Sequence, residues 1–311
     1  MRHPAYHLRP NKAVDRLILV EAIRRLEKLG DISAYTYFGF GGPYLEEFRL
    51  LYEIFPTIGM VSIEENGETH KRQKFHLPCG KLRLEHEEFQ SFLAQYQAND
   101  AKSIFWLDHT GLEYWHFESF IALLGKVAAG SMIKVTLQAE PMYYKDKPAE
   151  FRERFEAVMP DPYADPPVRF RDYVCLLQDM MRIAAQRALP AEMPLTFQPV
   201  SSFFYSDGTG MFTLTGVVWG RQELDKVKEK FKGWEFANLN WAAPKRIDVP
   251  ILSTKERLHL QHKLPCPRDA GKILYGTLGY LIDDTETRTE AKLRQYAAFH
   301  RYSPYFMKAT P

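Results

Sequence analysis

Short apolar runs alternate with amphipathic segments through the first 140 residues of the chain. Apolar runs bounded by turn residues indicate strands, and apolar residues at helical spacing indicate helices. The pattern predicts five strands, at residues 35–39, 59–63, 81–85, 103–107 and 131–138. Helices are expected between them, at residues 44–55, 70–75, 90–94 and 117–128. This alternation is typical of a doubly wound α/β fold, in which helices cover both faces of a mostly parallel sheet.

Glycines and acidic residues follow the predicted strands. Right-handed crossovers place the carboxyl ends of parallel strands at one edge of the sheet. The turn at Gly39–Gly42 and the side chains of Glu64, Glu88 and Asp108 all map to that edge. Because these residues are far apart in the sequence, their convergence predicts a functional site.

The first strand, glycine turn, helix and second strand have the order of a nucleotide-binding βαβ unit. Glycines let a ligand approach the backbone closely, and a carboxylate at Glu64 can accept hydrogen bonds from both ribose hydroxyls. A leading helix over residues 9–29 carries Asn11, Lys12 and Arg16 in its first turn. These side chains either overhang the ligand cleft or form an exposed polar turn.

The segment after the fifth strand departs from regular alternation. Residues 142–168 are rich in Pro, Asp and Tyr and are interpreted as an insertion over the cleft. A long helix is expected at residues 168–189. Two apolar runs, 195–205 and 211–219, then flank a turn rich in Gly and Ser, which predicts a β-hairpin. The hairpin places an antiparallel strand at the end of the parallel sheet.

The pattern changes again near residue 230, where we expect a domain boundary. Residues 1–230 form the predicted nucleotide-binding domain, and residues 231–311 form a small, mainly helical accessory region. Within that region Ser253 and Glu256 have the spacing of a capping box, which opens a short helix.

Composition bounds the class of protein. The chain is 45% hydrophobic and 26% charged, with a net charge of +2, as in an ordinary globular protein. No apolar run reaches the roughly 18–20 residues of a membrane helix, and the N-terminus lacks an apolar signal region, so we expect a cytoplasmic protein. The three cysteines are far apart, which argues against a disulfide framework or a thiolate metal site.

Basic residues concentrate at the two ends of the chain. Residues 1–30 carry seven Lys and Arg against three acids, and residues 288–311 carry five against one. These ends either form a patch for phosphate or nucleic acid, or are solvated helix faces.

Taken together, residues 33–220 resemble the Rossmann-like, SAM-dependent methyltransferases of class I. The resemblance depends on the glycine turn after the first strand, the acids after the next two strands, the Asp after the fourth and the final hairpin. That hairpin distinguishes the superfamily from nicotinamide dehydrogenases, which usually end in parallel strands. Residues 1–230 would then be the domain that binds S-adenosylmethionine (SAM).

The resemblance implies a role for each strand end. The glycine turn passes around the methionine part of SAM, the acid after the second strand binds the ribose, and the acids after the third lie near the adenine. The residue after the fourth strand lies next to the transferable methyl group. The implied cofactor site comprises Gly39, Phe40, Gly41, Gly42, Glu64, Glu65, Glu87, Glu88 and Asp108.

Two positions depart from the pattern of the superfamily. Tyr37 and Phe38 stand where an acidic residue usually precedes the first glycine. The sequence Asp108–Gly111 replaces the Asp/Asn-Pro-Pro-Tyr/Phe motif, which argues against an enzyme that methylates amino groups of adenine or cytosine.

Methyl transfer is an in-line displacement, so positioning supplies much of its catalysis. A base is required only when the acceptor must lose a proton. Asp108 and His109 are the candidates, and His109 is the better base near neutral pH, with His116 close behind in the sequence. A structural role for either histidine is the alternative.

The leading hypothesis is a SAM-dependent methyltransferase whose acceptor is an unidentified small molecule or macromolecule. The alternatives are a non-catalytic SAM-binding scaffold, an NAD-dependent oxidoreductase on a similar fold, and a nucleic-acid modifier that uses the basic ends.

Overall fold

A computed structural model describes residues 9–161, 165–266 and 268–303. Its chain divides into two compact units. The larger unit contains Val20–Phe204 and Thr209–Lys245. The smaller unit takes in residues up to Leu19, Tyr205–Gly208 and the chain from Arg246 onward. The predicted domain boundary at residue 230 stays a prediction.

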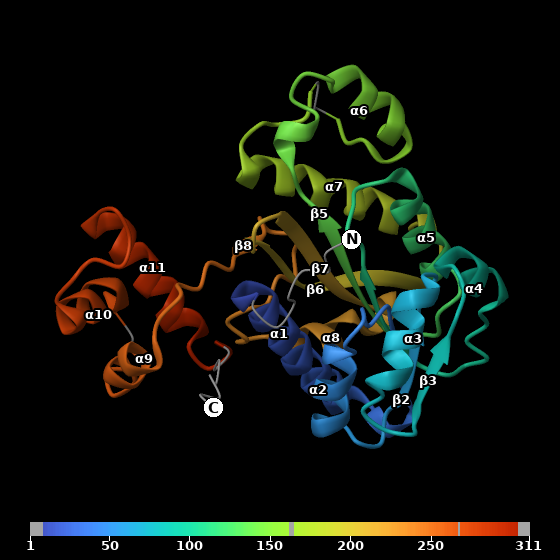
Figure 1. The fold of residues 1–311 in the computed structure, drawn as a ribbon. Coiled ribbons are helices and arrows are strands. Elements are labelled where there is room, and N and C mark those ends of the chain that lie inside the picture. Colours follow the sequence, from blue (N-terminus) through green and yellow to red (C-terminus); the bar gives the residue numbers. More distant parts are fainter. Residues whose placement is uncertain (1–8, 162–164, 267, 304–311) are drawn as a thin grey trace. The chain divides into compact units, whose positions relative to one another are not determined.

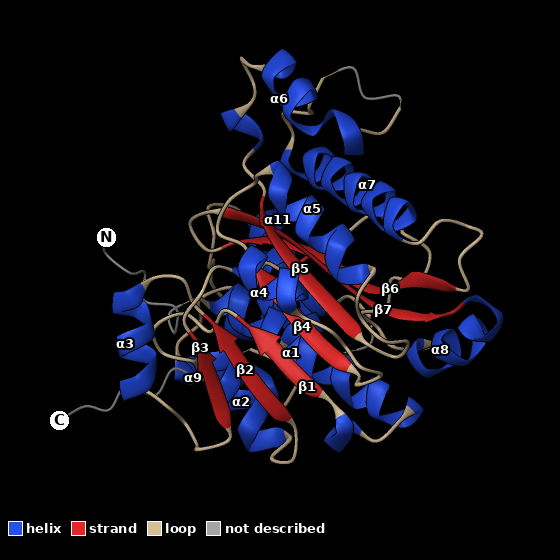
Figure 2. Ribbon diagram, turned by 90° about the vertical axis from the view of Figure 1, so that its right-hand side faces the viewer, coloured by secondary structure: helices blue, strands red, loops and turns tan. Residues whose placement is uncertain are grey.

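Eight strands form one sheet in the order β3-β2-β1-β4-β5-β7-β6-β8 (Figures 1 and 2). The pairs β3–β2, β2–β1, β1–β4 and β4–β5 are parallel, and β5–β7 is antiparallel. This arrangement confirms the predicted parallel sheet with its antiparallel hairpin. The strands are β1 (Thr36–Gly39), β2 (Gly59–Ile63), β3 (Leu82–Glu85), β4 (Ser103–Asp108), β5 (Met132–Gln138), β6 (Leu195–Ser206), β7 (Gly210–Gly220) and β8 (Lys245–Arg246).

Helices connect the strands and cover both faces of the sheet. Those from the first to the eighth are α1 (Pro10–Leu26), α2 (Glu46–Ile54), α3 (Gly67–Phe75), α4 (Phe89–Gln95), α5 (Tyr114–Leu124), α6 (Pro148–Phe155), α7 (Phe170–Ala188) and α8 (Leu224–Phe231). Side chains of α4, α5 and α7 form one apolar core with Phe38 and Phe105, whose rings stack 4.4 Å apart. The preceding residue of β1, Tyr37, points the other way, as strand geometry requires. Its ring lies 5.1 Å from that of Phe48 in α2.

The smaller unit contains three further helices. They are α9 (Thr254–Gln261), α10 (Ala270–Leu278) and α11 (Glu286–Phe299), and they gather together in Figure 1. The predicted capping box at Ser253 and Glu256 is present at the start of α9. The sequence pattern did not predict α10. For the last helix it predicts only residues 293–299, whereas α11 begins at Glu286. The Thr285 hydroxyl accepts a hydrogen bond from the Arg288 N–H and begins α11 earlier.

One helix of the larger unit also begins earlier than expected. The prediction began it at Phe117, whereas α5 begins at Tyr114. A capping box between Glu113 and His116 fixes that start, and its polar residues hid it from an apolar pattern.

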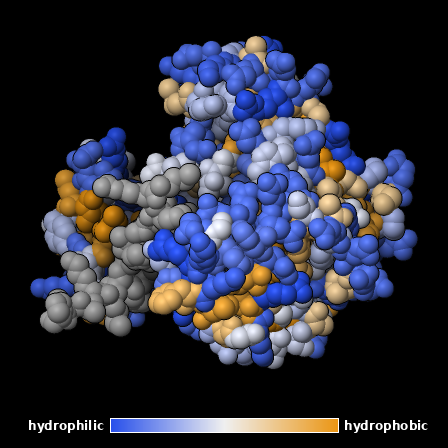
Figure 3. Space-filling view, turned by 45° about the vertical axis from the view of Figure 1, so that its right-hand side comes forward, coloured by the Kyte–Doolittle hydropathy of each residue, from blue (hydrophilic) through white to orange (hydrophobic). Residues whose placement is uncertain are grey.

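The surface is largely polar, with scattered apolar residues. Figure 3 shows apolar patches set among mostly hydrophilic side chains on the face that it presents. Phe75 and Ile251 are the most exposed large apolar side chains among the described residues, at 86% and 90%. No helix formed by described residues combines the length and apolarity needed to cross a membrane.

Candidate active site

The carboxyl ends of the parallel strands meet at one edge of the sheet. Gly39, the last residue of β1, pairs with Ser62 of β2 on one side and with Trp106 of β4 on the other. The N–H of Glu64 continues the ladder by donating to the carbonyl of Glu85, at 3.0 Å. The loops that follow β1, β2, β3 and β4 therefore leave the same edge. The roles assigned to their residues stay predictions.

The glycine turn after β1 has left-handed backbone at two positions. Gly41 has φ = 71° and Gly42 has φ = 52°. A Cβ at Gly41 would lie within 3.0 Å of the side chains of Leu45, Ser62 and Phe48, so only glycine fits there. A Cβ at Gly42 would meet nothing within 4 Å. The turn is thus tightly packed at Gly41 and open at Gly42, where a ligand has space to approach.

A residue that the sequence analysis missed holds this turn. Gln73 of α3 is fully buried, and its Nε2 donates to the carbonyls of Phe40 and Gly42, each at 3.0 Å. The Ser62 hydroxyl lies 3.3 Å from Gln73 Oε1 and 3.3 Å from the Phe40 carbonyl. No motif marks Gln73, because α3 has little apolar pattern and the contact crosses 33 residues of sequence.

Glu64 lies at the end of β2, as predicted, and is half-buried. Its Oε1 accepts a hydrogen bond from the Asn66 N–H at 2.8 Å. Burial raises the pKa of Glu64, and the hydrogen bond from Asn66 partly opposes that effect. Asn66 in turn caps α3 by accepting from the Thr69 N–H. The carboxylate is therefore held at the edge by the start of the next helix, while its neighbour Glu65 is exposed.

The end of β3 carries a histidine that the sequence analysis did not single out. His86 stacks on His70 of α3, with ring centroids 4.8 Å apart. Burial and the nearby Lys74 lower the pKa of His70. Of the predicted pair, Glu87 is half-buried, and Glu88 is exposed at the start of α4 without capping it through its side chain.

The end of β4 brings two of the loops into direct contact. His109 follows Asp108, and its imidazole lies 3.9 Å from His116, 5.1 Å from Trp115 and 5.6 Å from Phe40, between ring centroids. Phe40 belongs to the glycine turn, so the turn and the β4 loop share one aromatic cluster. Of the predicted site residues, Phe40 and His109 are thus brought together.

Both histidines of this cluster are neutral near pH 7. Burial lowers the pKa of His109 well below its usual value, and His116 adds to the effect. Burial lowers the pKa of His116 to about 4. His116 Nδ1 accepts from the Glu113 N–H at 3.1 Å, so its proton is on Nε2. His109 Nε2 is buried and has no hydrogen-bond partner within the described chain.

Two of the three polar residues of the leading helix, Asn11 and Lys12, make contacts within the smaller unit. Asn11 Nδ2 donates to Asp207 at 2.8 Å, and Asn11 Oδ1 accepts from the Val249 N–H at 2.9 Å. The Lys12 N–H donates to Asp207 at 2.9 Å, and Arg16 is half-buried. Their predicted place beside the cleft stays a prediction.

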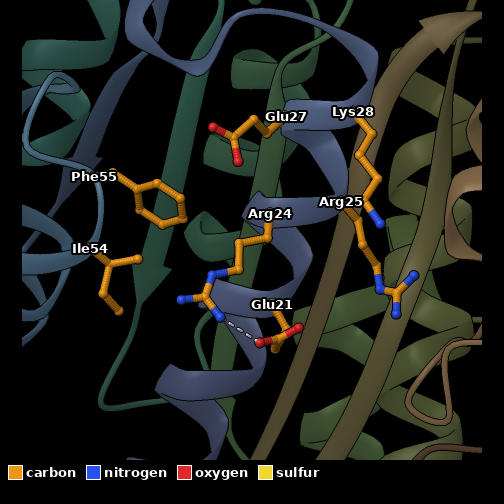
Figure 4. A pocket seen from close by; sticks show the side chains of 7 residues that line it. All are labelled: Glu21, Arg24, Arg25, Glu27, Lys28, Ile54 and Phe55. Carbon is orange, nitrogen blue, oxygen red and sulfur yellow. Dashed lines mark hydrogen bonds and ion pairs between the residues drawn. The ribbon is translucent and has the colours of Figure 1, made fainter.

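Two pockets of about 390 Å³ each lie away from these residues. One lies where the end of α1 approaches Ile54 and Phe55, and Figure 4 shows Arg24 paired there with Glu21. The other lies beside the end of α7 and Trp241. Over the ranges that the structure describes, no three His, Cys, Asp or Glu side chains are grouped to hold a metal ion.

The strand order, the antiparallel hairpin and the glycine turn define the fold of the class I SAM-dependent methyltransferases. The chain belongs to the family described as "Putative O-methyltransferase", whose family model matches residues 4–311.

Solved structures were also compared with the chain. Trm1 from Pyrococcus horikoshii, in complex with SAM, is 13% identical with a TM-score of 0.49, and the match covers 70% of this chain and 58% of that one. A putative O-methyltransferase from Klebsiella pneumoniae is 13% identical with a TM-score of 0.39, covering 69% and 83%. A probable spermidine synthase from Corynebacterium glutamicum is 13% identical with a TM-score of 0.42, covering 77% and 80%. Likenesses this low carry no argument about substrate. No curated protein matched.

Proposed function

We propose that this protein transfers a methyl group from SAM to a hydroxyl oxygen of its acceptor. The observation that carries the proposal is the contact between Phe40 of the glycine turn and His109 of the β4 loop. It places a neutral, buried imidazole beside the turn that is proposed to hold the cofactor. The description of the family as O-methyltransferases supports an oxygen acceptor.

The residues at the edge fit an adenosyl ligand with a charged amino-acid end. The open side of Gly42 leaves room for the ligand to approach the backbone. Glu64 is held at the end of β2, where its free acceptor positions are suited to two ribose hydroxyls. Glu87 and Glu88 follow β3 and are proposed to lie near the adenine.

His109 is proposed to accept the proton of the acceptor hydroxyl at Nε2. When bound, SAM supplies a methyl group activated by the sulfonium. In the proposed transfer the acceptor oxygen would bond to the methyl carbon as the sulfur–carbon bond breaks, and His109 would take up the hydroxyl proton. Its low pKa keeps His109 unprotonated at neutral pH, so one ring nitrogen has a lone pair that can accept the proton. Asp108 adjoins the same loop and is the second candidate.

Calorimetry with SAM, S-adenosylhomocysteine, NAD and ATP tests the cofactor. At about 100 times its dissociation constant a ligand stabilises the fold by roughly 2.7 kcal/mol, which a thermal shift detects. We expect the two adenosyl-sulfur ligands to bind the wild type and the Glu64→Ala variant to lose that binding. A response to NAD alone would contradict the proposal and favour an oxidoreductase. Binding of SAM without its consumption in an extract that contains acceptors would favour a non-catalytic scaffold.

A further inference from the structure

The glycine turn does not hold its shape by backbone bonds alone. We propose that Gln73 is the positioning residue that sets the turn for the cofactor, an inference that rests on the proposed function. The residue contacts the turn from α3, through the carbonyls of Phe40 and Gly42.

Three donor groups converge on one carbonyl of the turn. The Phe40 carbonyl lies 2.9 Å from the Gly42 N–H, 3.0 Å from Gln73 Nε2 and 3.3 Å from the Ser62 hydroxyl. The Gly42 carbonyl also accepts from Gln73 Nε2, at 3.0 Å. One side chain therefore fixes the orientation of two peptide groups in the turn.

The orientation of the Phe40 carbonyl decides where the next N–H points. In a trans peptide the C=O and the N–H point in opposite directions. Because the Phe40 carbonyl faces Gln73, the Gly41 N–H of the same peptide points away from Gln73. That N–H is proposed to donate to the carboxylate of the cofactor. Were the peptide to flip, a carbonyl oxygen would take its place and repel that carboxylate.

Glutamine is the side chain that suits this position. Its amide supplies two N–H donors and one acceptor, whereas an ionised glutamate supplies acceptors only. Gln73 is 0% exposed, so its hydrogen bonds are shielded from solvent. Loss of a buried donor leaves the carbonyls of Phe40 and Gly42 without that partner.

The chain contains a matched control in a second buried glutamine. Gln178 of α7 is 3% exposed, and its Nε2 donates to the carbonyls of Trp241 and Ala242, at 3.0 and 2.9 Å. Its Oε1 lies 3.4 Å from Asn238 Nδ2, much as Gln73 Oε1 lies near Ser62. Gln178 thus makes the same bonds at a turn that has no proposed part in the site.

The experiment compares Gln73→Glu with Gln178→Glu by calorimetric titration with SAM, with the melting temperature of each variant measured alongside. Loss of a buried hydrogen bond corresponds to about a tenfold to hundredfold change in an equilibrium constant. We expect both variants to lose stability, Gln73→Glu to lose about tenfold to hundredfold in SAM affinity, and Gln178→Glu to stay within about twofold of the wild type.

The pH dependence of binding separates positioning from general destabilisation. Burial raises the pKa of a carboxyl, and a protonated carboxyl can donate one hydrogen bond. The SAM affinity of Gln73→Glu, relative to that of the wild type, is therefore expected to fall as the pH rises. The corresponding ratio for Gln178→Glu is expected to stay flat.

The outcomes keep the two proposals apart. If the wild type binds no SAM, the proposed function fails; if it binds SAM and a folded Gln73→Glu variant binds within about twofold of it, only the role of Gln73 is overturned. Equal losses in the two glutamine variants would also overturn it. Should Gln73→Glu not fold, the uncharged Gln73→Met variant, of similar size, is judged by the same affinity criterion.

Discussion

The glycine turn and the turn at Trp241 have the same backbone and hydrogen-bonding features but differ in what lies beside the backbone. Both have left-handed backbone, with φ = 71° at Gly41 and 55° at Trp241. Both are held by a buried glutamine that donates to two carbonyls, Gln73 in one and Gln178 in the other.

The difference lies in what fills the space beside each backbone. At Gly42 an added Cβ would meet nothing within 4 Å. At Trp241 the indole itself packs on the core, with its ring 6.1 Å from that of Phe197. A non-glycine residue in left-handed backbone costs about 1–2 kcal/mol, which packing of the indole offsets. The same pattern of hydrogen bonds from a buried glutamine therefore supports a packed indole in the Trp241 turn and open space in the glycine turn.

The largest effect should appear where the open turn meets the β4 loop. His109→Gln removes the proposed base, and loss of a general base lowers the turnover rate by about 10²-fold or more. SAM affinity should stay within about threefold of the wild-type value. Calorimetry measures the affinity, and a radiolabelled-methyl assay measures the turnover rate. His259→Gln, a change in α9 of the smaller unit, is the control. Unchanged turnover in His109→Gln would remove His109 from the mechanism.

The second prediction concerns the packed indole of the Trp241 turn. Trp241→Gly relieves the left-handed backbone but deletes a large, partly buried ring, so we expect a loss of about 2–4 kcal/mol in the free energy of unfolding. Chemical denaturation measures this loss. SAM affinity should not change, and a large drop in that affinity would show that the two turns are not independent.

The third prediction concerns alanine substitutions in the glycine turn. Gly41→Ala combines left-handed strain with overlap against Leu45 and Phe48, and we expect a loss of about 2–4 kcal/mol in stability. Gly42→Ala adds only the strain of about 1 kcal/mol, because its Cβ meets open space. Both should weaken SAM binding. Gly42→Ala is the sharper test, and full retention of its SAM affinity would show that the open space is not the cofactor's path.

The last prediction concerns a histidine beside the open turn, His116, and the pH dependence of stability. The pKa of His116 is about 4 in the folded protein and about 6.5 when unfolded. The unfolded chain therefore binds the extra proton between these values, and stability falls as the pH drops from about 6.5 to about 4, by roughly 3 kcal/mol.

His116→Gln should flatten part of that decline, because a glutamine at the same helical position retains the capping box without titrating. Denaturation curves at pH 7 and pH 4.5 check it. An identical pH dependence in the variant would mean that other groups carry the effect.

Sequence patterns were sufficient for the sheet and for the positions of the strand ends. Apolar runs such as the one in β4 are long and regular, and short glycine turns are visible without knowledge of their partners. They were insufficient for Gln73, His86 and the start of α5, whose contacts join segments that are separate in sequence or involve polar residues.

By itself the sequence determined the doubly wound sheet, the hairpin and the edge at which Gly39–Gly42, Glu64 and Asp108 lie, because alternating periodicity and crossover handedness fix those features locally. Only the tertiary structure decided that Gln73 holds the turn and that His109 meets Phe40. Burial also decided that His109 and His116 are neutral, since a pKa depends on surroundings that no sequence spacing specifies.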